Sequence, residues 1–103
     1  MNGAPGGHVI VRGRAIERTF AAVAASTLGV APGDVSVKIA DERGVLRVDI
    51  RSRCARSAES VVEIAGRTRE AVLTEGALLT GSQIGTVRVR ITDLIEPKGR
   101  KLS

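Results

Sequence analysis

Aromatic residues are almost absent from this chain of 103 residues: Phe20 is the only one, and there is neither Trp nor Tyr. Sheet domains that bind single-stranded RNA, such as the RRM, stack bases on aromatic side chains, so this scarcity argues against that mode of recognition. The hydrophobic content is nevertheless 43%. We therefore expect a folded core that is built from Val, Ile, Leu and Ala.

Cysteine is scarce as well, and long apolar runs are missing. Cys54 is the only cysteine, which excludes an intrachain disulfide and a zinc site made from several cysteines, and fits a reducing compartment. No run reaches about 18 apolar residues, and residues 1–7 lack the basic and then apolar layout of a secretory signal. These absences predict a cytoplasmic protein that contacts a membrane only peripherally or through a partner.

Recognisable catalytic motifs are missing too. The chain has no Walker loop or dinucleotide fingerprint, and no spacing requires His8 and Cys54 to meet. The stretch Val11-Arg12-Gly13-Arg14 resembles the opening loop of acylphosphatases, but the positions of that family's catalytic Arg and Asn fall at about Ala21 and Val37. We therefore expect no enzymatic activity, no cofactor and no metal site.

The hydrophobic pattern predicts one α+β domain over residues 8–95, preceded by a flexible segment 1–7 and followed by a basic tail 96–103. Short alternating runs predict strands over 8–12, 34–53 (a hairpin) and 87–95, and helical periodicity predicts helices over 14–28 and 57–75, the second capped by Ser57. The order β-α-β-β-α-β packs as two helices on one face of a four-stranded sheet, mixed or antiparallel, in a ferredoxin-like or related fold. Gly29 supplies a stop for the first helix.

The hairpin is the clearest of these elements. Three apolar residues alternate with polar ones on each side of residues 41–44, where Gly44 can adopt a positive φ. The simplest register closes a four-residue loop. It pairs Ala40 with Val45, Lys38 with Arg47 and Ser36 with Asp49. This register places like charges directly opposite each other, at a cost of roughly 0.2–1 kcal/mol for each such pair.

Side chains that alternate with the apolar residues must point away from the helices. Many of them are cationic, in a chain that carries 16 Lys and Arg against 11 Asp and Glu. The candidate surface for an anionic partner consists of Arg12, Lys38, Arg47, Arg51, Arg88 and Arg90. Nucleic acid, anionic lipid and an acidic protein all fit such a surface. The simpler alternative is that these charges only keep the sheet soluble and protect its edges from pairing.

The ordered combination of segments resembles the alkaline shock protein family of bacterial envelope stress-response proteins, over residues 7–95. The segments that carry the resemblance are Gly7-His8-Val9-Ile10-Val11, Leu28-Gly29-Val30, the hairpin 35–50, the helix 61–72, Leu79-Thr80-Gly81 and Val87-Arg88-Val89-Arg90-Ile91. The chain departs from the family before the second helix, where Cys54-Ala55-Arg56-Ser57 replaces a common Tyr-Gly pair. High usage of Ala, Arg, Val and Gly is typical of a GC-rich, actinobacterial-like source.

This resemblance implies a non-enzymatic cytoplasmic scaffold in the envelope stress response. It implies a protein partner, which can be membrane-anchored, a peripheral position at the inner face of the membrane, and self-association. The competing hypothesis is a nucleic-acid-binding module that uses the same basic residues.

Overall fold

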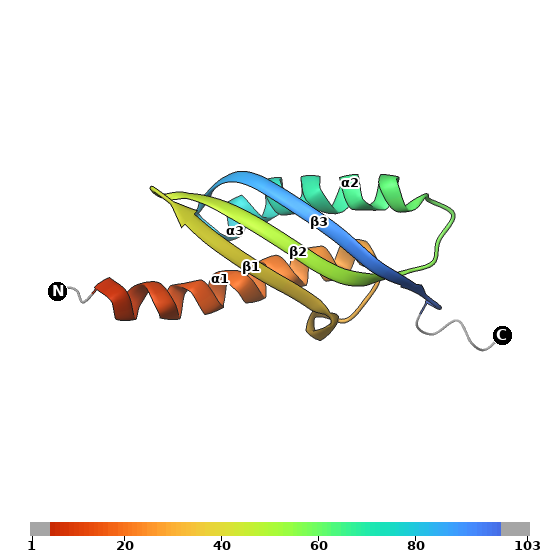
Figure 1. Cartoon of the computed structure of the whole chain (residues 1–103), viewed down its shortest axis with the longest axis horizontal. Coiled ribbons are helices and arrows are strands. Elements are labelled where there is room, and N and C mark those ends of the chain that lie inside the picture. Colours follow the sequence, from red (N-terminus) through yellow and green to blue (C-terminus); the bar gives the residue numbers. More distant parts are fainter. Residues whose placement is uncertain (1–4, 98–103) are drawn as a thin grey trace.

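The computed structural model describes residues 5–97, with side chains from residue 14 onward. Of the predicted terminal segments, residues 1–4 and 98–103 lie outside the described part of the chain. The elements, shown in Figure 1, are α1 (Pro5–Leu28), η1 (Pro32–Asp34), β1 (Val35–Glu42), β2 (Val45–Ala55), α2 (Val61–Ala71), η2 (Val72–Gly76), α3 (Ala77–Thr80) and β3 (Gln83–Ile95).

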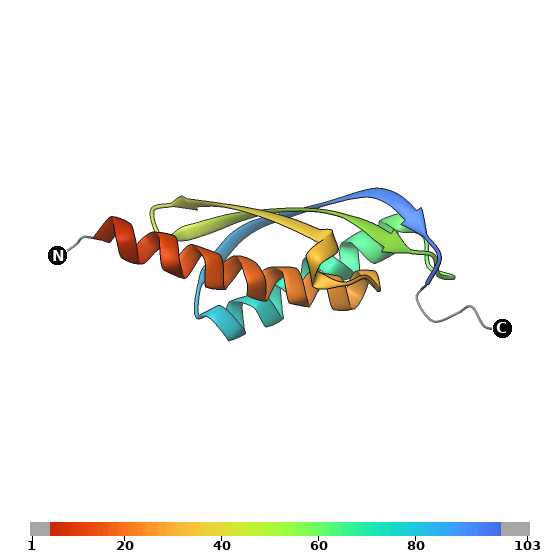
Figure 2. The same ribbon diagram turned by 90° about the horizontal axis from the view of Figure 1, so that it is seen from below.

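The sheet has three strands in the order β1-β2-β3, with β1 antiparallel to β2 and β2 parallel to β3. Both long helices lie on one face of this mixed sheet, as the view from below shows (Figure 2). The predicted α+β class and the placement of two helices on one face are therefore confirmed. The fourth strand that was predicted is not found among residues 5–97.

The predicted strand over residues 8–12 is wrong, because this segment belongs to α1. Val9, Ile10 and Val11 have the β-branched side chains that favour strands. However, extending a helix that is already formed costs far less than starting a separate element, and a glycine such as Gly13 weakens a helix by only about 1 kcal/mol. α1 therefore continues for 24 residues, about 36 Å, and its first part extends beyond the sheet (Figure 1).

The end of α1 was predicted correctly. Gly29 adopts a φ of 72°, and its amide donates a hydrogen bond of 2.8 Å to the carbonyl of Ala25. The amide of Val30 donates to the same carbonyl at 3.1 Å. This left-handed glycine ends the helix and turns the chain toward β1.

The hairpin turn is tighter than predicted. Only Arg43 and Gly44 lie between the strands, with φ of 59° and 85°, and Glu42 pairs with Val45. Two consecutive residues with positive φ match the right-handed twist of the strands, and the Asp41 carboxylate accepts a hydrogen bond of 2.8 Å from the Gly44 amide. The observed register pairs Lys38 with Asp49, Ala40 with Arg47 and Ser36 with Arg51. Lys38 therefore does not lie opposite Arg47 as expected, and because the shift is two residues, no side chain changes face.

β3 begins at Gln83, earlier than predicted, and two irregularities adjust it to β2. The pairing skips Gly85 and Thr92, so β3 carries an extra residue at each position. Gly85 is needed because a Cβ there would lie 2.7 Å from Val45 Cγ1. The second extra residue changes the alternation, so that Leu94, rather than Asp93, continues the apolar side that begins at Val87.

The second helix starts later than predicted. Ser60, rather than Ser57, is its N-cap: its hydroxyl accepts from the Glu63 amide at 3.1 Å, and the Glu63 carboxylate accepts from the Ser60 amide at 2.9 Å. Ser57 instead accepts from the Glu59 amide at 3.2 Å. After one π-helical segment the helical path continues through α3 and ends at Gly81, where φ is 69°.

The buried side of this helix repeats every four residues. Ile64, Thr68 and Val72 are buried, whereas Val62 is 80% exposed. A helix that begins at residue 61 presents the i, i+4 series 64–68–72 to the sheet. The Thr68 hydroxyl is satisfied by donating to the Ile64 carbonyl at 2.8 Å.

The core lies between the inner face of the sheet and the helices. Phe20 is fully buried at its centre. Gly76 fits against this ring so closely that a Cβ would come within 2.7 Å of Phe20 Cε1. The remaining core residues are aliphatic or small, as expected: Val23, Ala24, Leu28, Leu46, Val48, Ile50, Cys54, Ile64, Val72 and Val87.

Candidate interaction surface

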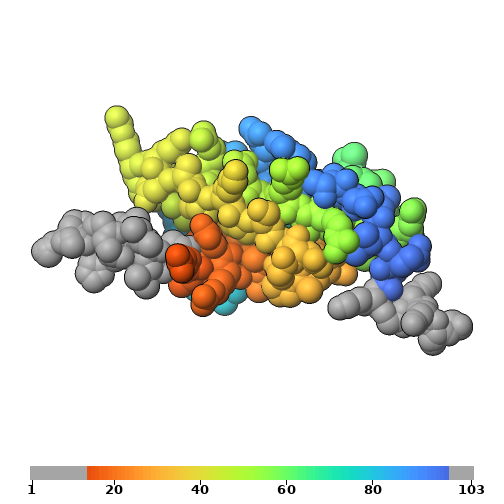
Figure 3. Space-filling view, turned by 60° about the horizontal axis from the view of Figure 1, so that its bottom comes forward, coloured from red at the N-terminus to blue at the C-terminus, as the bar shows by residue number. Residues whose placement is uncertain are grey.

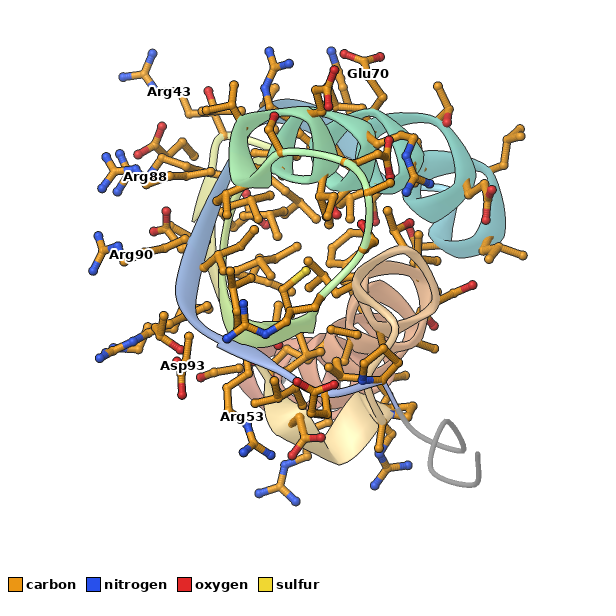
Figure 4. The ribbon with its side chains drawn as sticks, turned by 90° about the vertical axis from the view of Figure 1, so that its right-hand side faces the viewer. Arg43, Arg53, Glu70, Arg88, Arg90 and Asp93 are labelled. Carbon is orange, nitrogen blue, oxygen red and sulfur yellow. The ribbon has the colours of Figure 1, made fainter. Side chains whose placement is uncertain are left out.

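The face of the sheet that points away from the helices is called here the outer face. Among its residues are six cations, three carboxylates and three small residues: Ser36, Lys38, Ala40 and Glu42 from β1; Arg47, Asp49, Arg51 and Arg53 from β2; and Thr86, Arg88, Arg90 and Asp93 from β3. Figure 4 shows Arg88 and Arg90 pointing away from the helices. Long side chains of the strands also stand out from the surface in the space-filling view (Figure 3).

The structure brings together five of the six residues that were predicted for an anionic-partner surface. Lys38, Arg47, Arg51, Arg88 and Arg90 all lie on the outer face. Their pattern was visible in the sequence because strand side chains alternate.

Arg12 is the exception. It lies in α1 instead of in a strand, so it is not part of the outer face. The same helix spans Val11-Arg12-Gly13-Arg14, so this segment does not form the loop after a strand that the comparison with acylphosphatases supposed.

Sequence reasoning missed Arg53 and gave too little weight to the carboxylates. Arg53 continues the alternation of Arg47 and Arg51 along β2, and this pattern in the sequence could have placed Arg53 on the outer face. Its guanidinium lies 3.2 Å from the carboxylate of Asp34. Asp93 was hidden from the alternating pattern by the extra residue in β3.

Half of the six cations of the outer face are neutralised locally. Arg47 lies 3.2 Å from Glu42, and Arg88 lies 3.6 Å from Asp49. These pairs are solvent-exposed, so each contributes at most about 0–1 kcal/mol to stability. Their importance is that they cancel charge at two places on the face.

Three cations are left without such a partner. Arg51 and Arg90 are directly paired positions on the parallel strands β2 and β3, and Lys38 lies nearby on β1. Among residues 14–97, none of the ion pairs within 4.0 Å involves these three side chains. Two neighbouring arginines without a carboxylate repel each other, which costs a few tenths of a kcal/mol to about 1 kcal/mol.

A depression of about 190 Å³ coincides with these unpaired cations. Its lining consists of Ser36, Lys38, Asp49, Ile50, Arg51, Arg88 and Arg90. The hydroxyl of Ser36 adds a neutral donor to the guanidinium groups, since Ser36 is the β1 partner of Arg51. This depression is therefore the place on the outer face that is best suited to an anion.

At the edge of the domain, Glu59 in the segment between β2 and α2 is joined to Arg67 of α2. Two nitrogens of Arg67 lie 3.0 and 2.5 Å from the two carboxylate oxygens of Glu59. This bidentate hydrogen bond lowers the pKa of Glu59 and raises the pKa of Arg67. The pair ties the segment before the helix to the helix itself.

Cys54 lies under this segment and is poorly suited to act as a nucleophile. Its side chain is 1% exposed, and burial raises the pKa of its thiol, an effect that Arg67 partly opposes. The thiolate, which is the reactive form, is therefore disfavoured at neutral pH. The imidazole of His8 lies outside the described side chains, so the expectation that His8 and Cys54 do not form a catalytic pair stays a prediction.

The helical side carries a second kind of surface. Leu78 is 83% exposed and Leu79 is 67% exposed, both in the short helix that follows the π-helical segment. None of the candidate basic residues lies there. These two adjacent leucines give the helical side a small apolar surface.

Searches for similarity find no match for this chain among protein-family models, curated proteins or solved structures. Within residues 5–97, none of the helices combines the length and apolar character needed to cross a membrane. Among the side chains of residues 14–97, no group of three or more His, Cys, Asp or Glu is placed to hold a metal ion.

Proposed function

We propose that this protein is a non-enzymatic interaction module of the bacterial envelope stress response, which binds an acidic protein partner through the outer face. The observation that carries the proposal is the cluster of three unneutralised cations, Lys38, Arg51 and Arg90. Natural sheets can protect their edges with scattered charges. Leaving two arginines side by side, however, costs stability, and such a cost is typical of a residue kept for binding.

The assignment to envelope stress rests on the resemblance to the alkaline shock protein family. In this proposal the protein is cytoplasmic and reaches the inner face of the membrane through a membrane-anchored partner. The exposed leucines of α3 are available for self-association, which the same resemblance implies. The buried, protonated Cys54 supports a role without covalent catalysis.

The second candidate is binding of nucleic acid, which the net charge of +5 favours. Two features of the outer face favour a protein instead. Asp49, Asp93 and Glu42 interrupt the basic surface, so a continuous polyanion would meet carboxylates at several points. The outer face also has no aromatic residue on which bases could stack.

Fractionation of the native cells tests the proposal. We expect the tagged protein to sediment with membranes, to resist nuclease, and to lose this association when the membranes are stripped of protein by protease. The triple variant Lys38→Glu/Arg51→Glu/Arg90→Glu should stay in the supernatant.

The matched control reverses three exposed cations on the helical side, Arg14→Glu/Arg18→Glu/Arg69→Glu, with the same change in net charge. This control should still sediment. Release of the wild-type protein by nuclease would favour the nucleic-acid candidate, and equal loss in both triple variants would show that only total charge matters.

A further inference from the structure

The outer face contains one position where positive charge is concentrated and bounded. Arg51 and Arg90 are adjacent on neighbouring strands, and the next outward residues along β2 in either direction are Asp49 and Arg53. Asp49 is already in an ion pair with Arg88 at 3.6 Å, and Arg53 is in an ion pair with Asp34 at 3.2 Å. The cations without an ion-pair partner are therefore clustered at one place on the outer face and do not continue along the strands.

We propose that the depression formed by Ser36, Lys38, Arg51 and Arg90 binds one phosphate monoester, carried by a phosphorylated side chain of the protein partner. This inference rests on the proposed function, because it supplies the chemistry by which the outer face selects its partner. It commits to a phosphorylated protein, with free phosphate and nucleic acid as outcomes of the test.

The number and kind of donors favour a phosphate over a carboxylate. Two guanidinium groups offer planar pairs of N–H donors, and the ammonium and hydroxyl groups add single donors from β1. A carboxylate has two oxygens and one charge, so one guanidinium can saturate it. A phosphate monoester has three terminal oxygens and a charge of about −1.5 to −2 at neutral pH, which matches the several cations of the depression.

The carboxylates around the depression favour a single group over a chain of phosphates. Asp49 lines the depression itself, and Asp93 lies one outward step beyond Arg90 on β3. A nucleic-acid backbone that placed one phosphate on Arg51 and Arg90 would bring its next phosphates toward these carboxylates. A phosphorylated side chain brings one dianion, and the carboxylate that it approaches is Asp49, which already lies 3.6 Å from the guanidinium of Arg88.

The experiment uses the full chain and a short fluorescein-labelled peptide of Gly and Ser with one phosphoserine. Fluorescence anisotropy compares it with the same peptide carrying Ser or Glu at that position and with a labelled single-stranded oligonucleotide. We expect the phosphorylated peptide to bind most tightly, the Glu peptide more weakly, and the Ser peptide not measurably.

The double variant Arg51→Gln/Arg90→Gln should weaken binding of the phosphorylated peptide by about tenfold or more, because charge-assisted hydrogen bonds are lost. The matched control Arg47→Gln/Arg53→Gln removes the same charge from the outer face but leaves the depression intact. It should change the affinity by less than about threefold, the part due to long-range charge. In NMR spectra, inorganic phosphate should shift the Nε–Hε signals of Arg51 and Arg90 before those of the other arginines.

Three results would overturn the phosphate site. One is equal weakening by both double variants, another is equal binding of the Glu and phosphoserine peptides, and the third is tighter binding of the oligonucleotide. If any of these occurs while Lys38→Glu/Arg51→Glu/Arg90→Glu still abolishes sedimentation with membranes, the proposed function survives without the phosphate site. If peptide binding behaves as expected but sedimentation does not depend on the outer face, the site stands and its place in envelope stress is wrong.

Discussion

The two faces of the sheet are built from the same strands but follow opposite rules. On the inner face, Val48 and Ile50 are 0% and 1% exposed and belong to the same core cluster as Phe20 of α1 and Ile64 of α2. On the outer face, the residues between and beyond them, Asp49 and Arg51, meet solvent and other charges. The comparison separates two tasks within a short segment of chain: inward residues determine whether the domain folds, and outward residues determine what it can bind.

The inner face should respond most strongly to loss of volume at its centre. Phe20→Ala removes a fully buried ring from between the sheet and the π-helical segment, and we expect a loss of about 3–5 kcal/mol in the free energy of unfolding. Urea denaturation followed by circular dichroism measures it. Phe20→Leu, which retains most of the apolar volume, is the control and should lose much less; equal losses would mean that the ring is not closely packed.

A smaller effect is expected when volume is added to the core from the π-helical segment η2, which packs against Phe20. Gly76→Ala places a methyl group 2.7 Å from the ring of Phe20, so we expect destabilisation by about 1–3 kcal/mol. Gly66→Ala in α2 is the matched control, because a Cβ there meets nothing within 4 Å and alanine favours helix by up to about 1 kcal/mol. The two variants should therefore move the urea midpoint in opposite directions. A rise in both would show that the helix yields easily at Gly76.

The smallest effect is expected outside the two faces of the sheet, where the exposed ion pair of Glu59 and Arg67 joins the β2–α2 segment to α2. Because the pKa of Glu59 is lowered in the folded state, its contribution is present above its ordinary value of 4.5 and is lost as the pH falls through the folded-state value. Wild type and Glu59→Gln should therefore differ most at neutral pH and converge in acid. A difference that does not depend on pH between neutral and acidic buffers would contradict this role of the Arg67 hydrogen bond.

The sequence predicted the alternation better than the geometry that depends on distant contacts. Val48, Ile50 and the residues between them were assigned to the correct faces because alternation is a local property of a strand. The register was wrong by two residues because it depends on whether Arg43 accepts a positive φ, which its residue type does not favour. The face of Asp93 could not be predicted, because an extra residue in β3 is visible only once β2 is beside it.

The first helix also shows that a local sequence pattern does not determine how far an element extends. Residues 14–28 have helical periodicity and a glycine stop, and both were predicted. Residues 8–12 have the composition of a strand, and nothing local in them shows that the helix continues through Gly13. Five of the six candidate residues were nevertheless placed together correctly, and only Arg12, whose assignment depended on that strand, was not.

The most direct test of the central claim is to measure stability and binding in the same variant of the outer face. Arg51→Gln/Arg90→Gln removes a repulsive pair, so its free energy of unfolding should equal that of the wild type or exceed it by up to about 1 kcal/mol, while its sedimentation with native membranes is lost. That combination would show that the two arginines are kept for binding. Retained sedimentation, or a loss of stability large enough to account for the lost binding, would contradict the division of labour between the two faces.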